Sequence, residues 1–95
     1  MRSEVRHEAE KTRYTLWVDG DYVGLAEYTV RGDDVVFVHT EIDPAHRHEG
    51  LGATLVEGAL DDAHERFGGH IVPACPFVAE FIHEHPDYQE LLAVG

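Results

Sequence analysis

Residues 13–42 alternate between apolar and polar positions with the period of two that is typical of β-strands. Aromatic and β-branched residues are frequent in three segments, and strands are expected at residues 13–18, 22–30 and 35–42. Turn-forming residues at 19–21 and 31–34 separate these segments, so we expect an antiparallel three-strand meander. Gly24 inside the second strand predicts a bulge or a close approach of another backbone. Residues 1–12 are polar and are expected to form a frayed tail or an added strand.

The second half of the chain changes to the apolar period of an α-helix. The apolar positions of this helix are Leu51, Leu55, Val56, Ala59, Leu60, Ala63 and Phe67. The opposite positions, expected to form a solvated face, include Asp61, Asp62, His64 and Glu65. Glycines at 68–69 are expected to end the helix, and a short buried strand follows at 70–74. Pro76 suits the first position of a second helix, which Pro86 stops, with one or two further helical turns at 86–92. The order β-β-β-α-β-α-α predicts an α+β fold with helices packed on a mixed sheet.

Length and composition narrow the class of protein. The chain has 95 residues and is expected to form a single domain across residues 1–95. No apolar run is long enough to cross a membrane and the polar N-terminus shows no signal peptide, so a cytoplasmic location is expected. The single cysteine excludes an internal disulfide. A net charge of −12 argues against a nucleic-acid partner, which requires a basic surface. The acidity is consistent with solubility, adaptation to salt or a cationic partner, and the composition does not separate these.

Two glycines, Gly50 and Gly52, lie where the third strand is followed by the helix. The first turn of a helix has unpaired N–H groups and the positive end of the helix dipole. Glycines leave these groups open to a phosphate, and Arg47 adds positive charge at the rim. The loop is therefore a candidate pyrophosphate site built from backbone amides. The alternative is a tight strand-to-helix turn that binds nothing.

The segment that contains these glycines is Arg47-His48-Glu49-Gly50-Leu51-Gly52. It resembles the Gln/Arg-x-x-Gly-x-Gly/Ala signature of the GNAT superfamily of N-acetyltransferases. Two further segments, His39-Thr40-Glu41-Ile42 and Pro73-Ala74-Cys75-Pro76-Phe77, resemble motifs of a minimal GNAT-like subfamily. The resemblance covers about residues 14–92 and implies the minimal GNAT-like fold. His48-Glu49 departs from the pattern of many relatives, which have a glycine and a Gln or Arg there, and Glu49 adds negative charge near the phosphate site.

The resemblance implies acetyl-CoA as cosubstrate and, as acceptor, an amine on a small molecule or a protein. In GNAT folds the pantetheine lies where two neighbouring strands splay apart, which places Glu41 and Ile42 beside it. The cofactor-binding loop implied by the resemblance consists of Arg47, His48, Glu49, Gly50, Leu51, Gly52 and Ala53. Cys75 is expected near the end of the neighbouring strand. The oligomeric state stays open.

Three residues are candidates for the chemistry. Alternation along the third strand places His39 and Glu41 on one face with Val35 and Phe37, provided that no bulge interrupts it. Together His39 and Glu41 are a candidate base for an amine; the alternatives are a structural histidine and an edge or pocket-wall carboxylate. Cys75 precedes the expected start of the second helix, where amides and the helix dipole favour a thiolate. It is a candidate to take the acetyl group from CoA and pass it on, or else a small buried hydrophobe.

The sequence therefore predicts an acetyl-CoA-dependent N-acetyltransferase that acts directly or through the Cys75 thiolate. One alternative is a non-catalytic CoA-binding or protein-interaction module on the same fold. The other is a structural protein whose glycine loop binds nothing. No metal site is expected, because the pairs His46/His48 and His83/His85 lack a second pair with zinc-ligand spacing and are expected to be solvated.

Overall fold

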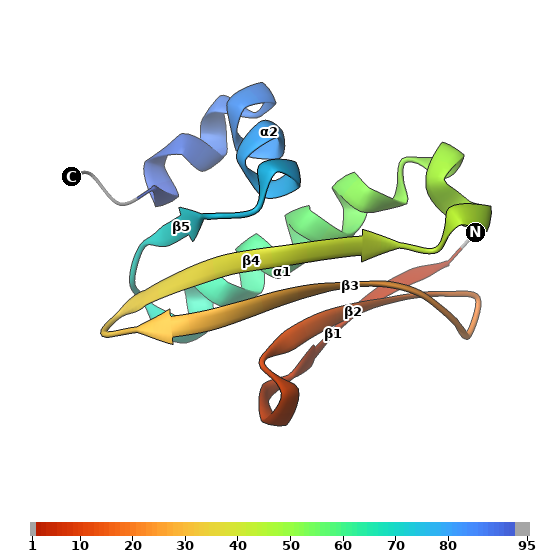
Figure 1. Cartoon of the computed structure of the whole chain (residues 1–95), viewed down its shortest axis with the longest axis horizontal. Coiled ribbons are helices and arrows are strands. Elements are labelled where there is room, and N and C mark those ends of the chain that lie inside the picture. The colour runs from red at the N-terminus through yellow and green to blue at the C-terminus, as the bar shows by residue number, and fades with distance from the viewer. Residues whose placement is uncertain (1, 93–95) are drawn as a thin grey trace.

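Five strands form one mixed sheet in the order β1-β2-β3-β4-β5, with α1 running along it and α2 next to β5 (Figure 1). The computed structural model describes residues 2–92, apart from the side chains of residues 47–49. The strands are β1 (Ser3–Glu8), β2 (Arg13–Val18), β3 (Asp21–Arg31), β4 (Asp34–Ile42) and β5 (Ile71–Pro73). The helices are α1 (Leu51–Phe67) and α2 (Pro76–Glu84), with 3-10 helices η1 (Ala9–Lys11), η2 (Pro44–Glu49) and η3 (Pro86–Leu91).

The connections follow from the strand directions. The first four strands pair antiparallel in chain order, and β5 pairs parallel with β4. A parallel pair needs a long crossover, which α1 supplies. The α+β fold with helices on a mixed sheet, predicted from the sequence, is confirmed.

Of the two alternatives for residues 1–12, the added strand is confirmed: Ser3–Glu8 forms the edge strand β1, so the meander has four strands. Val5 is the single aliphatic residue of this strand, and a Cβ added to Gly58 of α1 would lie 2.7 Å from it. His7 stacks on Tyr14 of β2 with 4.7 Å between the ring centroids. The inward side chains of Val5 and His7 thus hold β1 against the rest of the protein, whereas its other positions are polar. Such a short apolar pattern in the sequence does not distinguish a strand from a tail.

One hydrophobic core lies between the sheet and the helices. The buried residues of α1 are Leu51, Leu55, Val56, Ala59, Leu60 and Ala63, in agreement with the predicted helical period. Large side chains from the sheet and α2 complete the core, among them Tyr14, Leu16, Phe37, Val78 and Ile82. Gly68 ends α1 in the left-handed conformation (φ 72°), and its N–H donates to the carbonyl of His64 at 3.1 Å. α2 begins at Pro76, also as predicted.

A β-bulge in β4 changes which of its side chains face the core. The register between β3 and β4 shifts beside Val38, which has no cross-strand partner and is exposed. Phe37 is buried, and Thr40 faces the same side, since it pairs with a buried alanine of β3. His39 and Glu41 therefore lie on the opposite face of the sheet, where both are exposed.

The prediction that Val35 and Phe37 share a face with His39 and Glu41 is wrong for this reason. Strict alternation assumes an unbroken strand, and one extra residue reverses the side to which every later side chain points. His39 and Glu41 still share a face with each other, because both follow the bulge.

β4 and β5 separate soon after they pair. The parallel pairing joins Val35–Phe37 to Ile71–Pro73 and then ends. Beyond Phe37, the edge of β4 that faces β5 continues through residues 38–41 without a strand partner in the described part of the chain. The N–H of Cys75 donates to the carbonyl of Phe37 at 2.9 Å, and the chain then enters α2. An opening is left between β4 and the first turns of α1 and α2.

Candidate active site

A cavity of about 720 Å³ lies at this opening. Its lining consists of His39, Thr40, Glu41 and Ile42 of β4, Gly50, Gly52 and Ala53 at the start of α1, and Phe77 of α2. The fold thus brings the glycine loop and the end of β4 to one cavity, although α1 and β4 are separate elements. These are the two segments that the sequence analysis assigned to one ligand.

The first turn of α1 leaves backbone N–H groups available. Gly50 precedes the helix in the left-handed conformation (φ 70°), and no side-chain cap is formed by the described residues. The first internal bond of the turn is donated by the N–H of Thr54 to the carbonyl of Gly50 at 3.4 Å. The amides of residues 51–53, together with the positive end of the helix dipole, therefore favour an anion at this position.

The individual residues of the glycine loop have different surroundings. The side chain of Leu51 is buried in the core, so only its amide could meet a ligand. Gly52 lies against Phe77, and a Cβ added there would overlap the phenyl ring. Gly50 has open space around it but adopts the left-handed conformation that favours glycine, whereas a side chain at Gly52 would have to displace the ring of Phe77, so the two glycines serve different purposes. Arg47, His48 and Glu49 form part of η2, and the expected roles of their side chains lie outside the described residues.

His39 and Glu41 form a pair at the cavity. The Nε2 atom of His39 lies 3.1 Å from Oε1 of Glu41, and both side chains are more than half exposed. An exposed pair contributes little to stability. It is nevertheless a suitable base, since the carboxylate stabilises the imidazolium that forms when the histidine takes a proton. The structure therefore brings together the two residues that were expected to act as one group.

Cys75 lies behind the cavity wall rather than on it. Its side chain is buried, with 6% of its surface exposed. The residue is the N-cap of α2 in an extended conformation, which is the position that the sequence predicted. Its Sγ–H donates to Oγ1 of Thr40 at 3.6 Å, and Thr40 lines the cavity. The thiol is therefore connected to the cavity through one hydroxyl group.

Two residues of the cavity were not predicted. Thr40 lies between His39 and Glu41 in sequence, and its opposite orientation follows from the alternation of a strand. Alternation counted from Phe37 would have turned Thr40 away from Cys75, so the bulge at Val38 is the reason that Thr40 was not predicted. Phe77 gives a weak signal, an aromatic residue in the first turn of α2 that is 43% exposed.

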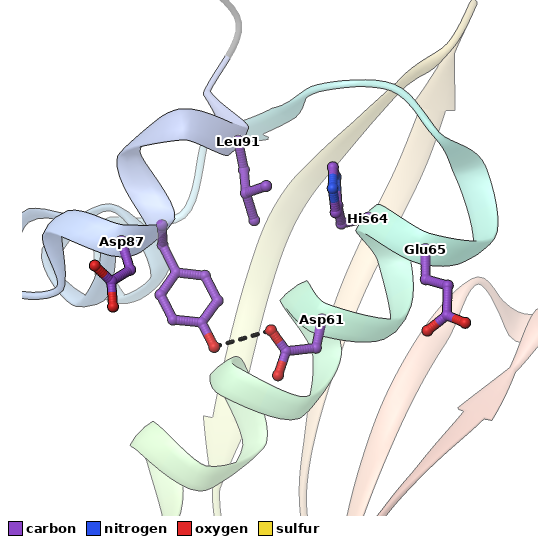
Figure 2. Close-up of a pocket in the computed structure, with 6 residues that line it drawn as sticks. Asp61, His64, Glu65, Asp87 and Leu91 are labelled. Atoms are coloured by element: carbon purple, nitrogen blue, oxygen red, sulfur yellow. Dashed lines mark hydrogen bonds between the residues drawn. The ribbon is translucent and has the colours of Figure 1, made fainter.

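A second hollow lies between α1 and η3 (Figure 2). It is lined by Asp61, His64, Glu65, Asp87, Tyr88 and Leu91. The hydroxyl of Tyr88 donates to Oδ1 of Asp61 at 2.9 Å, the dashed contact in Figure 2, and so attaches η3 to α1. Burial, followed by the Asp61 carboxylate, raises the pKa of Tyr88, so the phenol remains a donor. This hollow shares no residue with the first cavity.

The expectation of a wholly solvated helix face is wrong for Asp62. This residue is half-buried and accepts hydrogen bonds from the hydroxyl of Tyr14 at 2.7 Å and from Nε of Arg66 at 2.9 Å. The Arg66 hydrogen bond is the main cause that lowers the pKa of Asp62. The carboxylate thus fastens α1 to β2, and its role is structural.

Across residues 2–92, with the side chains of 47–49 set aside, no three His, Cys, Asp or Glu residues are grouped so that they could hold a metal ion. No described helix combines the length and apolar character needed to cross a bilayer.

A mixed sheet that opens beside an uncapped helix start defines a class of protein that can hold an anionic cofactor at that helix. Residues 13–91 match the sequence profile of the GCN5-related N-acetyl-transferase family, the GNAT family. The chain belongs to this family.

Known proteins agree with this assignment. Streptothricin acetyltransferase of Streptomyces lavendulae is 33% identical over 63 residues, which cover 64% of this chain and 33% of that protein. The chain therefore spans about a third of the length of this curated relative. A GCN5-like protein of Staphylococcus aureus superposes with a TM-score of 0.70 at 16% identity, covering 95% of this chain and 87% of the other. The ribosomal-protein-S18-alanine N-acetyltransferase of Escherichia coli gives a TM-score of 0.61 at 23% identity, covering 82% and 53%. At these identities the two structures show a shared fold.

Proposed function

We propose that this protein is an acetyl-CoA-dependent N-acetyltransferase that acts on an amine in the cytoplasm. Its family carries out acetyl transfer from acetyl-CoA. The observation that carries the proposal is the cavity in which the open first turn of α1 meets the part of β4 that lies beyond its pairing with β5. The helix start suits the pyrophosphate of CoA, and the strand edge suits the amides of its pantetheine arm.

The residues present fit this cosubstrate. The N–H groups at Gly50–Ala53 are proposed to hold the pyrophosphate, with Arg47, His48 and Glu49 completing the loop. Glu41 and Ile42 are proposed to lie beside the pantetheine at the end of β4, with backbone groups of Glu41 pairing with its amides. Binding through backbone amides requires little positive charge, which agrees with an acidic chain.

Two routes of transfer are compatible with the cavity. In the direct route the acceptor amine attacks the thioester carbon while His39, supported by Glu41, takes the amine proton. In the other route Cys75 first accepts the acetyl group and the amine then removes it. The buried position of Cys75 requires that the acetyl group reach it past Thr40.

The acceptor is proposed to be an amine of a small molecule or a protein. Streptothricin acetyltransferase is named for a small-molecule acceptor, and the Escherichia coli enzyme is named for an alanine of a ribosomal protein. A panel that contains streptothricin, simple aliphatic amines and peptides with free N-termini therefore covers both classes.

The test is calorimetric titration with acetyl-CoA, followed by mass spectrometry of the panel after incubation. We expect micromolar binding and acetylation of at least one amine. If the covalent route operates, Cys75→Ala lowers transfer at least ~tenfold, and Glu41→Gln lowers it about a hundredfold if the direct route operates. Asp61→Asn in the second hollow is the matched control and should retain full transfer. Absence of acetyl-CoA binding in the wild-type protein would contradict the proposal.

A second candidate function is a non-catalytic CoA-binding or protein-interaction module. The observation in its favour is the burial of Cys75, together with Glu49, which adds negative charge to the phosphate loop. This candidate predicts acetyl-CoA binding without acetylation of any member of the panel.

A further inference from the structure

Thr40 is the side chain that connects Cys75 with the cavity. Its Oγ1 accepts the thiol hydrogen bond at 3.6 Å, and the residue itself lines the cavity. His39 and Glu41 flank Thr40 in sequence but lie on the opposite face of β4, so neither faces Cys75.

Both partners of this contact are held in place. The N–H of Cys75 donates to the carbonyl of Phe37 at 2.9 Å, and its carbonyl accepts from the N–H of Ala79 at 3.0 Å. Thr40 belongs to β4 and is β-branched, so its hydroxyl has few rotamers available. The bulge at Val38 is what turns Thr40 toward the helices. In an unbroken strand His39 would take this orientation instead.

We propose that Thr40 is a proton-relay residue for acetyl transfer through Cys75. The inference rests on the proposed function and adds to it a role for the hydroxyl. In the resting protein the thiol of Cys75 donates a hydrogen bond to Oγ1 of Thr40. When Oγ1 takes up a proton during transfer, the hydroxyl gives its own proton to the sulfur that leaves the acetyl carbon. A hydroxyl group serves this purpose because it is donor and acceptor at once, and no charged group is needed inside the buried wall.

The first step transfers the acetyl group from CoA to Cys75. The Sγ atom of Cys75 forms a bond to the acetyl carbon, and the bond between that carbon and the CoA sulfur breaks. The thiol proton passes to Oγ1 of Thr40 while the hydroxyl proton of Thr40 passes to the CoA sulfur. The products are S-acetyl-Cys75, CoA thiol and an unchanged Thr40.

The second step uses the same path in reverse. The amine nitrogen forms a bond to the acetyl carbon, and the bond between that carbon and Sγ of Cys75 breaks. One amine proton is delivered through Oγ1 of Thr40 to the sulfur. The amide product leaves, and Cys75 regains its thiol without any further reactant.

The experiment compares Thr40→Val, which removes the hydroxyl at nearly constant volume, with Thr40→Ser, which keeps it. Each variant is mixed with acetyl-CoA without an acceptor, and acetylation of Cys75 is followed by rapid quench and mass spectrometry. We expect Thr40→Val to slow acetylation at least ~tenfold and Thr40→Ser to stay within about threefold of wild type. Calorimetric affinity for acetyl-CoA should change little in both. Thr29→Val, the same replacement at an exposed position of β3, is the control and should keep the wild-type rate.

A proton inventory, measured on the wild-type protein, tests the relay without any variant and therefore does not depend on whether a variant folds. A relay moves two protons in one step, so the rate of Cys75 acetylation should depend on the deuterium fraction along a curve rather than a straight line. A straight line would overturn the relay.

The remaining outcomes separate the relay from the proposed function. Acetylation of Cys75 at the wild-type rate in Thr40→Val overturns the relay but leaves the transferase intact. Undiminished transfer to amines in Cys75→Ala also overturns the relay and leaves the transferase intact, because the transfer is then direct. A wild-type protein that does not bind acetyl-CoA removes both.

Discussion

His7 of β1 is a histidine whose protonation the fold opposes. Its Nε2 lies 2.6 Å from the hydroxyl oxygen of Tyr28, and its ring stacks on Tyr14. Burial is the main cause that lowers the pKa of His7, the nearby Arg66 lowers it further, and Asp62 acts in the opposite direction. The neutral imidazole is thus part of the contact between β1 and the core.

The pH dependence of stability tests this contact. The unfolded chain binds a proton at His7 near pH ~6.5, whereas the folded protein binds it only at lower pH. The free energy of unfolding should therefore be constant above this value and fall as the pH decreases toward the folded pKa. Urea denaturation between pH 7.5 and 5 should show a smaller decline for His7→Gln than for wild type. His83→Gln, which removes an exposed histidine of α2, should follow wild type. Equal slopes in wild type and His7→Gln would contradict the prediction.

At the scale of elements, β4 determines the site, and the irregularities of β3 and β4 were not equally predictable. The glycine loop, α1, α2 and the four strands β2, β3, β4 and β5 follow from apolar period and turn residues, so their positions could be predicted. The glycine in β3 signalled its close packing, and a register shift also occurs in β3 beside it, opposite Leu16 and Trp17. The bulge at Val38 has no local signature, because it is fixed by pairing with β3. For that reason the sequence identified His39, Glu41 and Cys75 but not the orientation of Thr40.

Gly24→Ala tests how closely β3 and β4 are packed. A Cβ at this position would lie 2.6 Å from the carbonyl oxygen of Glu41 and from Cδ1 of Ile42. The side chain of Ile42 can move, but the Glu41 carbonyl belongs to the backbone of β4. We expect a loss of about 1–3 kcal/mol in the free energy of unfolding, measured by urea denaturation, and weaker acetyl-CoA binding because the cavity edge shifts. Wild-type stability and affinity would show that β4 yields without cost.

At the scale of the whole molecule, the negative net charge of the protein opposes binding of the proposed anionic ligand. The net charge is −12, and the longest dimension of the molecule is 38 Å. At ~0.01 M ionic strength the Debye length is about 30 Å, so nearly every carboxylate acts on an anion in the cavity. At ~0.15 M it is about 8 Å, and only groups close to the cavity still act. The helix start provides local attraction, whereas the remainder of the surface provides repulsion over a longer range.

Acetyl-CoA should therefore bind more tightly as sodium chloride is added over this range. Salt removes the long-range repulsion first, while the short backbone contacts at Gly50–Ala53 persist, and we expect Kd to fall roughly threefold or more between ~0.01 and ~0.15 M. Calorimetric titration at each concentration measures this, with S-acetylpantetheine, which lacks phosphates, as the ligand whose affinity should not change. The opposite trend, weaker binding of acetyl-CoA with added salt, would mean that cationic side chains close to the ligand dominate over the net charge. Because most anion sites show that opposite trend, the sign of the salt effect alone distinguishes a cradle of backbone amides on an acidic protein from a cationic pocket.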